Sequence, residues 1–561
     1  MERSRSRTTF ALFGMAGALV GSTALVPSAA RAAPSPTCAG LATQLLPQKG
    51  IVSATSVIQA ATSTDKSYCL VNILVSDLAG PKDGYLPGQR QEINIGIGLP
   101  LSAADGGTGG AIGAWNQRIQ DLGGGGYAGS VGNVTGATDN GFVGSSTDTG
   151  HVGGRGSFAL NPDNTLNQGL INDFAFNGIH EQATWSKKLA KMYYGKQQKY
   201  AYWNGCSTGG RQGHQQAQKY PTDYDGILAG ASAFNWDRLL SSGGYGPVVM
   251  NQEVGAPISP AKLNAVTSAA VAACDGLDGI LDGVIQDPRA CNYDASAFVC
   301  KGTPTDPANC LTTAEASAVN KIWAGPFKSK NKQEWFGINP GASFSTLDGA
   351  TPIFFSTDWF QFWVFQNPSF DWHTLTEASF DSAFKQGELK FHNVIGTDNP
   401  DLSAFRDNGS KMITYHGLAD PLIMPDGTYN YYNRVTDAMG GLQATQKFYR
   451  FFPFPGNGHC GGNSGFPNAP VINSDDLFAA LVNWVEHGVA PNSIDAANNS
   501  NPTLATVTRP ICKYPDKLVY DGFGNTNSAL SFACKEKTND PLQSVETQVI
   551  PDAGDTSSST N

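Results

Sequence analysis

Short apolar runs, separated by glycine-rich and polar stretches, predict a series of buried β-strands along the chain. The run at 93–99 alternates with period two, and the runs at 200–203 and 448–452 are rich in aromatic residues. The predicted strands are 67–75, 93–99, 200–203, 224–231, 412–415 and 448–452, and the predicted helices are 211–220 and 474–487, the latter with Ser474 as its N-cap. Strands that alternate with helices predict an α/β fold.

A glycine-flanked serine lies between the predicted strand at 200–203 and the predicted helix at 211–220. The residues are Gly205, Cys206, Ser207, Thr208 and Gly209, which form a Gly-x-Ser-x-Gly motif. In a nucleophile elbow the serine occupies a strained turn, and side chains at either glycine would collide with the strand or the helix. With 65 glycines in the chain, such a motif also arises by chance as a turn with an inert serine. The flanking strand and helix favour Ser207 as a nucleophile.

Two later residues complete a candidate catalytic set. Asp420 follows the predicted strand 412–415, and His459 lies on a glycine-rich loop after the strand 448–452. The order Ser207, Asp420, His459 is the chain order of α/β-hydrolase triads. His151 and His180 precede Ser207, which is the wrong order for this class, so we interpret them as structural.

Backbone N–H groups for a developing oxyanion are predicted at two places. The N–H of Thr208 begins the helix after the nucleophile. The second place is a run of four glycines that follows the segment 115–122. Such a run is either a flexible turn or a nest of anion-binding N–H groups, and α/β-hydrolases take their second donor from a loop upstream of the nucleophile. The candidates are Gly124, Gly125 and Gly126.

The pattern changes at about residue 234, where clear strands become few, and it changes back near residue 406. We interpret 234–405 as a lid domain inserted into an α/β-hydrolase domain made of 33–233 and 406–550. An aromatic cluster in this lid is ordinary core or a wall over the active site, and on the second interpretation Trp359, Phe360, Trp363 and Phe365 contact substrate. The polar tail 551–561 is predicted to be disordered.

Closely spaced aspartates with glycines between them predict a calcium site in the lid. The side chains of Asp275, Asp278 and Asp282 would converge, and the backbone carbonyls of Ile280 and Val284 would complete an oxygen shell. The spacing differs from that of an EF-hand. The alternative is an acidic surface turn.

Charge and the N-terminal segment limit the partners and the location. The formal net charge of −10 argues against a nucleic-acid partner. Three arginines, an apolar run at 10–26 and an Ala-Arg-Ala site predict a signal peptide over 1–32. No later apolar run has the length of a membrane span. The mature protein is therefore expected to be soluble and either secreted or periplasmic.

The ten cysteines all lie beyond the predicted signal peptide, so disulfides are favoured over metal ligands. Cys206 directly precedes Ser207, and Cys460 directly follows His459. If the serine and the histidine form a pair, these two cysteines are close enough to form a disulfide that holds the pair together. A free Cys206 acting as the nucleophile is the alternative, which an oxidising compartment disfavours.

The chain resembles the tannase and feruloyl esterase family from about Cys38 to Cys534. The resemblance is carried by the segment 205–211, the segment 275–284, the segment 416–420 and Gly458-His459-Cys460. It implies an α/β-hydrolase with structural calcium in its lid. It also implies the disulfides Cys206–Cys460, Cys38–Cys69, Cys274–Cys291, Cys300–Cys310 and Cys512–Cys534, although sequence alone permits other pairings.

The resemblance implies hydrolysis of small aromatic esters, such as ferulate, coumarate or gallate esters, free or linked to a plant polymer. Some relatives hydrolyse mono-(2-hydroxyethyl) terephthalate, whose free carboxylate requires a cation. No lysine or arginine occurs from Gln333 to Phe384, which favours neutral phenolic acyl groups. A non-catalytic binding protein on a hydrolase scaffold is the remaining alternative, and the complete set of three catalytic residues argues against it. The sequence does not indicate the oligomeric state.

Overall fold

The computed structural model describes residues 36–76, 92–107, 114–302, 309–328, 332–344, 346, 349–461, 466–498 and 505–536. These residues fall within one compact unit that begins at Pro36. The predicted signal peptide (1–32) and the predicted disordered tail (551–561) lie outside the described residues.

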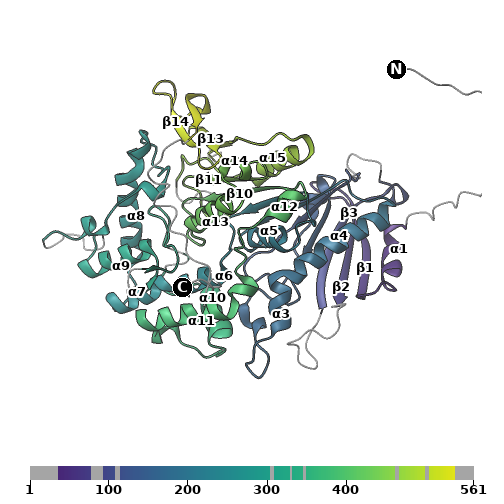
Figure 1. Cartoon of the computed structure of the whole chain (residues 1–561), viewed down its shortest axis with the longest axis horizontal. Helices are drawn as coiled ribbons and strands as arrows, with labels where there is room; N and C mark the ends of the chain where they lie inside the picture. Colours follow the sequence, from purple (N-terminus) through teal and green to yellow (C-terminus); the bar gives the residue numbers. More distant parts are fainter. Residues whose placement is uncertain are drawn as a thin grey trace, which may run out of the picture. The chain divides into compact units, whose positions relative to one another are not determined.

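A nine-stranded mixed sheet forms the centre of the fold, in the order β1-β2-β3-β5-β4-β6-β7-β10-β11. The β1/β2, β2/β3 and β3/β5 pairs are antiparallel, and all pairs from β5 to β11 are parallel. Figure 1 shows the purple strands of the N-terminal segment at one side of the sheet. The strands are β1 (Ile51–Gln59), β2 (Tyr68–Ser76), β3 (Glu92–Pro100), β4 (Arg118–Leu122), β5 (Val143–Thr147), β6 (Tyr200–Cys206), β7 (Gly226–Gly230), β10 (Lys411–Gly417) and β11 (Tyr449–Phe454).

Burial along the strands explains why these sequences form them. In β2 every second residue is buried, whereas all five residues of β7 are buried. An outer antiparallel strand has one protected face, and a central parallel strand is covered on both faces by helices. The α/β fold predicted from the apolar runs is therefore confirmed.

Helices cover both faces of the sheet. On one face α4 (Gly178–Tyr194), α5 (Thr208–Lys219) and α13 (Pro425–Ala438) share a core with alternate residues of the central strands. On the other face α15 (Ser474–His487) packs on β7 and β10. The N-cap of α15 is Asn473, whose side chain accepts from Asp475 N–H, and not Ser474 as predicted. Asn473 adopts the extended backbone of a cap, whereas Ser474 is already helical.

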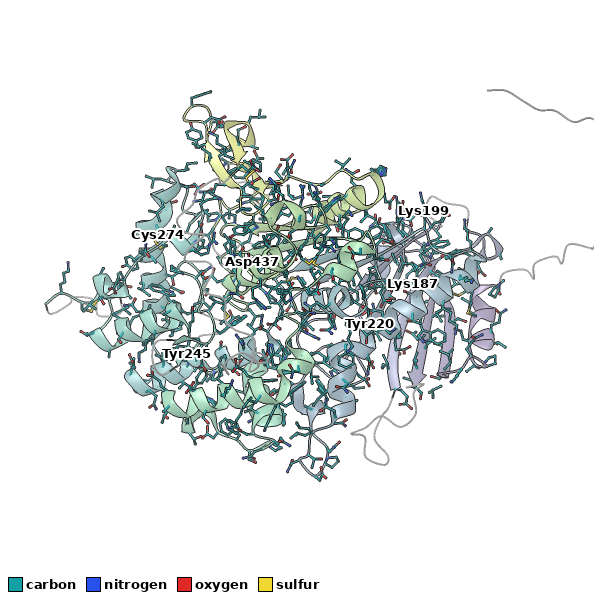
Figure 2. The ribbon with its side chains drawn as sticks, in the orientation of Figure 1. Lys187, Lys199, Tyr220, Tyr245, Cys274 and Asp437 are labelled. Carbon is teal, nitrogen blue, oxygen red and sulfur yellow. A yellow bond between two sulfur atoms is a disulfide. The ribbon has the colours of Figure 1, made fainter. Side chains whose placement is uncertain are left out.

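Helices dominate the segment predicted to be a lid. It contains α6 (Trp236–Ser242), α7 (Tyr245–Glu253), α8 (Pro260–Cys274), α9 (Thr313–Ala324), α10 (Phe354–Asp358), α11 (Glu377–Ile395) and α12 (Ser403–Asp407). All of these helices except α12, whose Phe405 belongs to the core of the sheet and which runs past residue 405, share an apolar core that also includes Tyr127 and Phe174 from before Ser207. Figure 2 labels Tyr245 on α7 and Cys274 at the end of α8. The boundaries at 233/234 and 405/406 remain predictions.

The remaining elements are short. Three two-stranded sheets pair β8 (Phe327–Lys328) with β9 (Lys332–Gln333), β12 (Ser493–Ala497) with β13 (Thr508–Cys512), and β14 (Lys517–Tyr520) with β15 (Phe532–Lys535). The other helices are α1 (Cys38–Leu45), α2 (Thr135–Asp139), α3 (Gln168–Asn172) and α14 (Leu442–Thr445). Among the described residues, no helix is both long and apolar enough to cross a lipid bilayer.

Candidate active site

Ser207 occupies a strained turn between β6 and α5. Its φ of 64° and ψ of −124° lie in a region that residues other than glycine rarely adopt. Three backbone hydrogen bonds hold this conformation: Ser207 N–H donates to Gly230 O, and Ser207 O accepts from Arg211 N–H and Ala233 N–H. The turn is the geometry of a nucleophile elbow.

Glycine is required at both flanking positions because the strand and the helix touch there. A β-carbon on Gly205 would lie 2.6 Å from the carbonyl carbon and oxygen of Gly209. On Gly209 a β-carbon would lie 3.1 Å from the α-carbon of Gly123, in the glycine run after β4. The motif therefore allows close packing of strand, helix and glycine loop around the serine.

Asp420 and His459 come from the ends of the neighbouring strands β10 and β11. His459 Nδ1 lies 2.8 Å from Asp420 Oδ2. His416 Nε2 lies 3.1 Å from the same oxygen, and the other carboxylate oxygen accepts from the N–H groups of Leu422 and Ile423. Asp420 is fully buried, so these four contacts fix the orientation of its carboxylate.

Asp420 and His459 also shift each other's pKa. Burial alone would raise the pKa of Asp420, but the charges and hydrogen bonds of His459 and His416 outweigh burial and hold the pKa well below its usual range. Burial alone would lower the pKa of His459, yet the Asp420 carboxylate outweighs it and raises the pKa above the ordinary 6.5. An ionised Asp420 beside His459 suits a histidine that accepts a proton during catalysis.

The Cys206–Cys460 disulfide links the residue directly before Ser207 to the residue directly after His459. The two cysteine α-carbons are 5.8 Å apart, although 254 residues separate them in sequence. Among the described residues, the Ser207 hydroxyl and the His459 imidazole form no hydrogen bond with each other. Such bonds are often long before substrate binds. The other four disulfides also pair as the resemblance implied, which are Cys38–Cys69, Cys274–Cys291, Cys300–Cys310 and Cys512–Cys534.

The glycine loop offers fewer oxyanion donors than the sequence suggested. The N–H of Gly124 already donates to Gln212 Oε1 at 2.9 Å, which removes Gly124 from the candidates. The N–H groups of Gly125 and Gly126 donate to none of the described residues. Thr208 Oγ1 donates to Gly126 O and holds this loop against the start of α5. The candidate donors are therefore Thr208 with Gly125 or Gly126.

A small apolar cavity of about 30 Å³ lies beside Ser207. It is lined by Ser207, Thr208, Gly126, Ala233, Trp236, Leu239, Leu240, Ile353, Phe355, Leu422 and Ile423. No lining side chain carries a charge. A site needs at least about 10–15 Å³ to hold one water molecule, so this cavity has room for only a few waters.

The aromatic residues predicted to contact substrate do not line this cavity. Trp359, Phe360 and Trp363 are completely buried, and the indole N–H groups of the two tryptophans donate to Ser241 Oγ and Gly156 O. Phe365 stacks on Phe370. These four residues belong to the core behind the cavity, which corrects their predicted role. A run of aromatic residues does not reveal which faces the cavity, and in this case Trp236 and Phe355 do.

The side chain of Arg211 packs against the ring of Trp236. It is fully buried on α5, and its guanidinium stacks over the rings of Phe174 and Trp236. It donates to Phe174 O and Ala175 O. No carboxylate among the described residues pairs with it, and burial lowers its pKa to about 9.

The predicted calcium ligands lie together in one loop, but their side chains do not converge. Asp275 Oδ1 accepts from the N–H groups of Asp282, Gly283 and Val284, and Asp282 Oδ2 pairs with Arg509 at 3.1 Å. Among the described residues, no three acidic, histidine or cysteine side chains are gathered as a metal cluster. The oxygen-rich donor set suits a hard cation, which would have to draw Asp282 away from Arg509.

His151 and His180 have partners away from the catalytic set. His151 Nε2 lies 2.7 Å from Tyr127 O, and the ring stacks on Phe158. His180 Nδ1 lies 2.7 Å from Asp223 Oδ2. His416 was not among the predicted site residues, although its position four residues before Asp420 was a signal that it contacts the carboxylate.

The chain is similar to known tannases and feruloyl esterases. A family model described as tannase and feruloyl esterase matches residues 112–535. A probable feruloyl esterase of Arthroderma benhamiae is 36% identical over 488 residues, covering 84% of this chain and 86% of that protein. The crystal structure of feruloyl esterase B from Aspergillus oryzae matches with a TM-score of 0.76 and 27% identity, covering 89% of this chain and 99% of that one. The tannin acyl hydrolase of Aspergillus niger shares the fold, with a TM-score of 0.73, 24% identity and coverage of 87% and 91%.

Proposed function

The chain belongs to the tannase and feruloyl esterase family, and from this premise we propose that it is a secreted serine esterase for esters of neutral aromatic acids. Ser207 is the nucleophile, His459 the general base and Asp420 the residue that orients the imidazole. The strained Ser207 turn beside the bonded Cys206–Cys460 pair carries the proposal. The predicted signal segment and the five disulfides support export.

In the proposed reaction His459 takes the proton of Ser207 as Ser207 Oγ attacks the ester carbonyl carbon. The N–H of Thr208, with that of Gly125 or Gly126, stabilises the oxyanion. His459 then gives the proton to the departing alcohol, and an acyl-enzyme remains. Water, deprotonated by His459, releases the acid and restores Ser207. Asp420 stabilises the imidazolium in both halves of the reaction.

The uncharged cavity wall favours a neutral acyl group. A terephthalate monoester would place its free carboxylate among apolar side chains, where an unpaired charge is costly. Arg155, which does not line the cavity, pairs with Asp358 through two of its three guanidinium nitrogens. We therefore propose phenolic acyl groups of the ferulate, coumarate or gallate type over terephthalate. The Phe355 ring, which packs against Gly126, is the part of the wall that we expect to move.

We further propose that calcium binds the loop of Asp275, Asp278 and Asp282, with the carbonyls of Ile280 and Val284, in a structural role. Burial and the charges of the other two aspartates raise the pKa of Asp278. A bound cation would relieve the repulsion between the three carboxylates, and carboxylate and carbonyl oxygens are the ligands that calcium prefers.

A substrate panel tests the catalytic proposal. Methyl ferulate, methyl gallate and mono-(2-hydroxyethyl) terephthalate are assayed with the native protein and with Ser207→Ala. We expect turnover of at least one phenolic ester, weaker turnover of the terephthalate, and a loss on the order of 10⁶ in kcat for Ser207→Ala. Residual turnover near the native rate in a folded Ser207→Ala protein would contradict the nucleophile. Failure of a fluorophosphonate probe to label native protein would favour the non-catalytic alternative.

A further inference from the structure

A buried histidine between two carboxylates lies next to the helix that supplies part of the cavity wall, and none of the proposed catalytic steps uses it. His392, near the end of α11, is 8% exposed. Its Nδ1 lies 3.1 Å from Asp237 Oδ2, and its Nε2 lies 3.2 Å from Asp398 Oδ1. Asp237 is completely buried, and Asp398 is 8% exposed. Both nitrogens of one imidazole therefore face a carboxylate in the interior of the protein.

This geometry requires a charged His392. A neutral imidazole has one N–H, so it donates to one carboxylate, and its bare nitrogen repels the other. An imidazolium donates from both nitrogens. Arg434 of α13 also pairs with Asp398, at 3.1 Å, and burial raises the pKa of Tyr431 on the same helix well above its usual value, so that hydroxyl stays neutral. The two carboxylates and the guanidinium sum to one negative charge, which is costly to bury and which an imidazolium cancels.

The elements packed around His392 carry other charged side chains, and these have their own contacts. Arg238 of α6 lies 3.1 Å from Glu388 of α11, and Lys385 reaches Glu388 at 3.3 Å. Arg211 of α5 donates to backbone carbonyls. Arginine and lysine keep their charge far above neutral pH, whereas histidine is the side chain that changes charge most readily near neutrality. The charge balance around α6 therefore depends on the proton of His392.

Two contacts tie the start of α6 to the segment 392–398. One is the contact of Asp237 with His392, and the other is the hydrogen bond that Asn235 N–H donates to Gly396 O at 2.6 Å. The same helix supplies three residues to the wall of the cavity beside the proposed nucleophile, which are Trp236, Leu239 and Leu240.

The segment 392–398 is also bonded to the two helices that follow the nucleophile and the triad aspartate. Thr397 Oγ1 donates to Gln215 Oε1 of α5 at 2.8 Å, and Thr397 O accepts from Gln218 Nε2 at 3.2 Å. Arg434 holds Asp398 on α13. The position of the cavity wall relative to α5 and α13 therefore depends on the contacts of this segment.

We propose that His392 is a positioning residue that holds α6 and its part of the cavity wall in place while it is an imidazolium, an inference that rests on the proposed esterase function. Loss of its proton breaks the contact with one carboxylate and leaves a negative charge buried between α6, α11 and α13. α6 then shifts, and an aromatic acyl ring loses its fit against Trp236. An acetyl group touches less of this wall. The preference for aromatic over small acyl groups therefore decreases as pH rises.

The ratio of two turnover measurements separates the wall from the catalytic histidine. We measure kcat/KM against pH for methyl dimethoxycinnamate, which has no titratable group, and for methyl acetate. Titration of His459 acts on both esters and cancels in their ratio. We expect the ratio of cinnamate to acetate turnover to fall about tenfold from neutral to alkaline pH, because small displacements of a substrate-positioning group have effects of this size or larger.

Substitutions of His392 identify the group responsible. His392→Arg stays charged and can donate to both carboxylates, so its ratio should stay high at every pH. His392→Gln is neutral and should have the low ratio at every pH. His180→Gln is the matched control, because His180 faces one carboxylate, that of Asp223, and does not line the cavity. It should keep the native profile.

Asp398→Asn keeps a hydrogen-bond acceptor but removes one negative charge, so the fall in the ratio should move to lower pH. This variant decides the question if thermal unfolding shows that His392→Arg does not fold. A native ratio that is independent of pH, or an unchanged fall in the folded His392→Arg or Asp398→Asn protein, would overturn the role of His392.

A binding measurement separates this inference from the esterase proposal. Ser207→Ala protein, with and without His392→Arg, is titrated calorimetrically with methyl dimethoxycinnamate at neutral and alkaline pH. We expect binding to weaken at alkaline pH only where His392 is present. If native protein hydrolyses neither ester but binding still follows His392, the esterase function fails and the positioning role stands. If both esters are hydrolysed and binding is the same at both pH values, the positioning role alone fails.

Discussion

Asp420 joins two histidines through a single oxygen atom. Its Oδ2 faces both His459 and His416, while Oδ1 accepts two backbone N–H groups. Without His416, Oδ2 of the carboxylate would be held by His459 alone. We interpret His416 as a positioning residue that acts on the reaction only through Asp420.

This arrangement predicts the pH dependence of the reaction. The base must be neutral to accept a proton, and the Asp420 carboxylate raises the pKa of His459 above 6.5. We therefore expect kcat/KM to rise with pH through a midpoint above about 6.5, since this profile reports the free enzyme. Asp420→Asn should move the midpoint to lower pH and lower kcat by roughly 10⁴.

The same shift has a defined sign for stability. A histidine whose folded pKa is raised stabilises the fold below its unfolded pKa, and this contribution is lost as pH rises through the folded pKa. Activity and this part of the stability therefore change in opposite directions with pH. Asp371→Asn is the control, because Asp371 pairs with the exposed His373 and should leave the rate profile unchanged. A midpoint at or below 6.5 in the native protein would contradict the proposed electrostatic role of Asp420.

At the scale of elements, the close contact between β6 and α5 fixes the position of Ser207, the proposed nucleophile. Gly205→Ala would place a methyl group 2.6 Å from the Gly209 carbonyl, so strand and helix must separate. Overpacking of this kind costs typically about 1–3 kcal/mol, and we expect kcat to fall at least about tenfold because Ser207 moves with the helix.

Gly136→Ala is the matched control for this substitution. Gly136 lies on α2, and a β-carbon there would meet no atom within 4 Å. Thermal unfolding and kcat are measured for both variants. Native turnover in Gly205→Ala would show that the close approach is not required for catalysis.

Elements near the catalytic set were predictable because their signals are local. The apolar run at 412–415 became β10, and the segment at 211–220 became most of α5. Sequence could not show which aromatic side chains face the cavity, because residues 359–364 form a π-helical turn that changes the spacing of side chains around the helix. Nor could it reveal that Gln212 occupies the Gly124 N–H, since the two residues are 88 positions apart.

On the scale of the whole molecule, the loop of Asp275, Asp278 and Asp282, for which we propose calcium binding, contacts a residue far along the chain. Arg509 reaches Asp282 across 227 residues and already neutralises part of the acidic charge. Calcium that replaces this contact should stabilise the native protein, and a concentration one hundred times the Kd would add about 2.7 kcal/mol. The melting temperature of chelated protein should therefore rise when calcium is restored, with kcat unchanged.

Substitution of the loop tests this proposal. Asp278→Asn should abolish the calcium-dependent rise, while Asp475→Asn, at the exposed start of α15, should preserve it. Melting curves that are identical with and without calcium, in protein shown to be metal-free, would count against the site.

The Cys206–Cys460 disulfide closes nearly half of the chain into a covalent ring. Every residue from 207 to 459 lies within the loop that this bond closes, including Ser207, Asp420 and His459. A protease that cuts one peptide bond in this loop opens the ring without dividing it, so the serine and the histidine remain on one molecule. A protein with this connectivity can be nicked in an exposed turn of the segment 234–405 and still migrate as a single species until it is reduced.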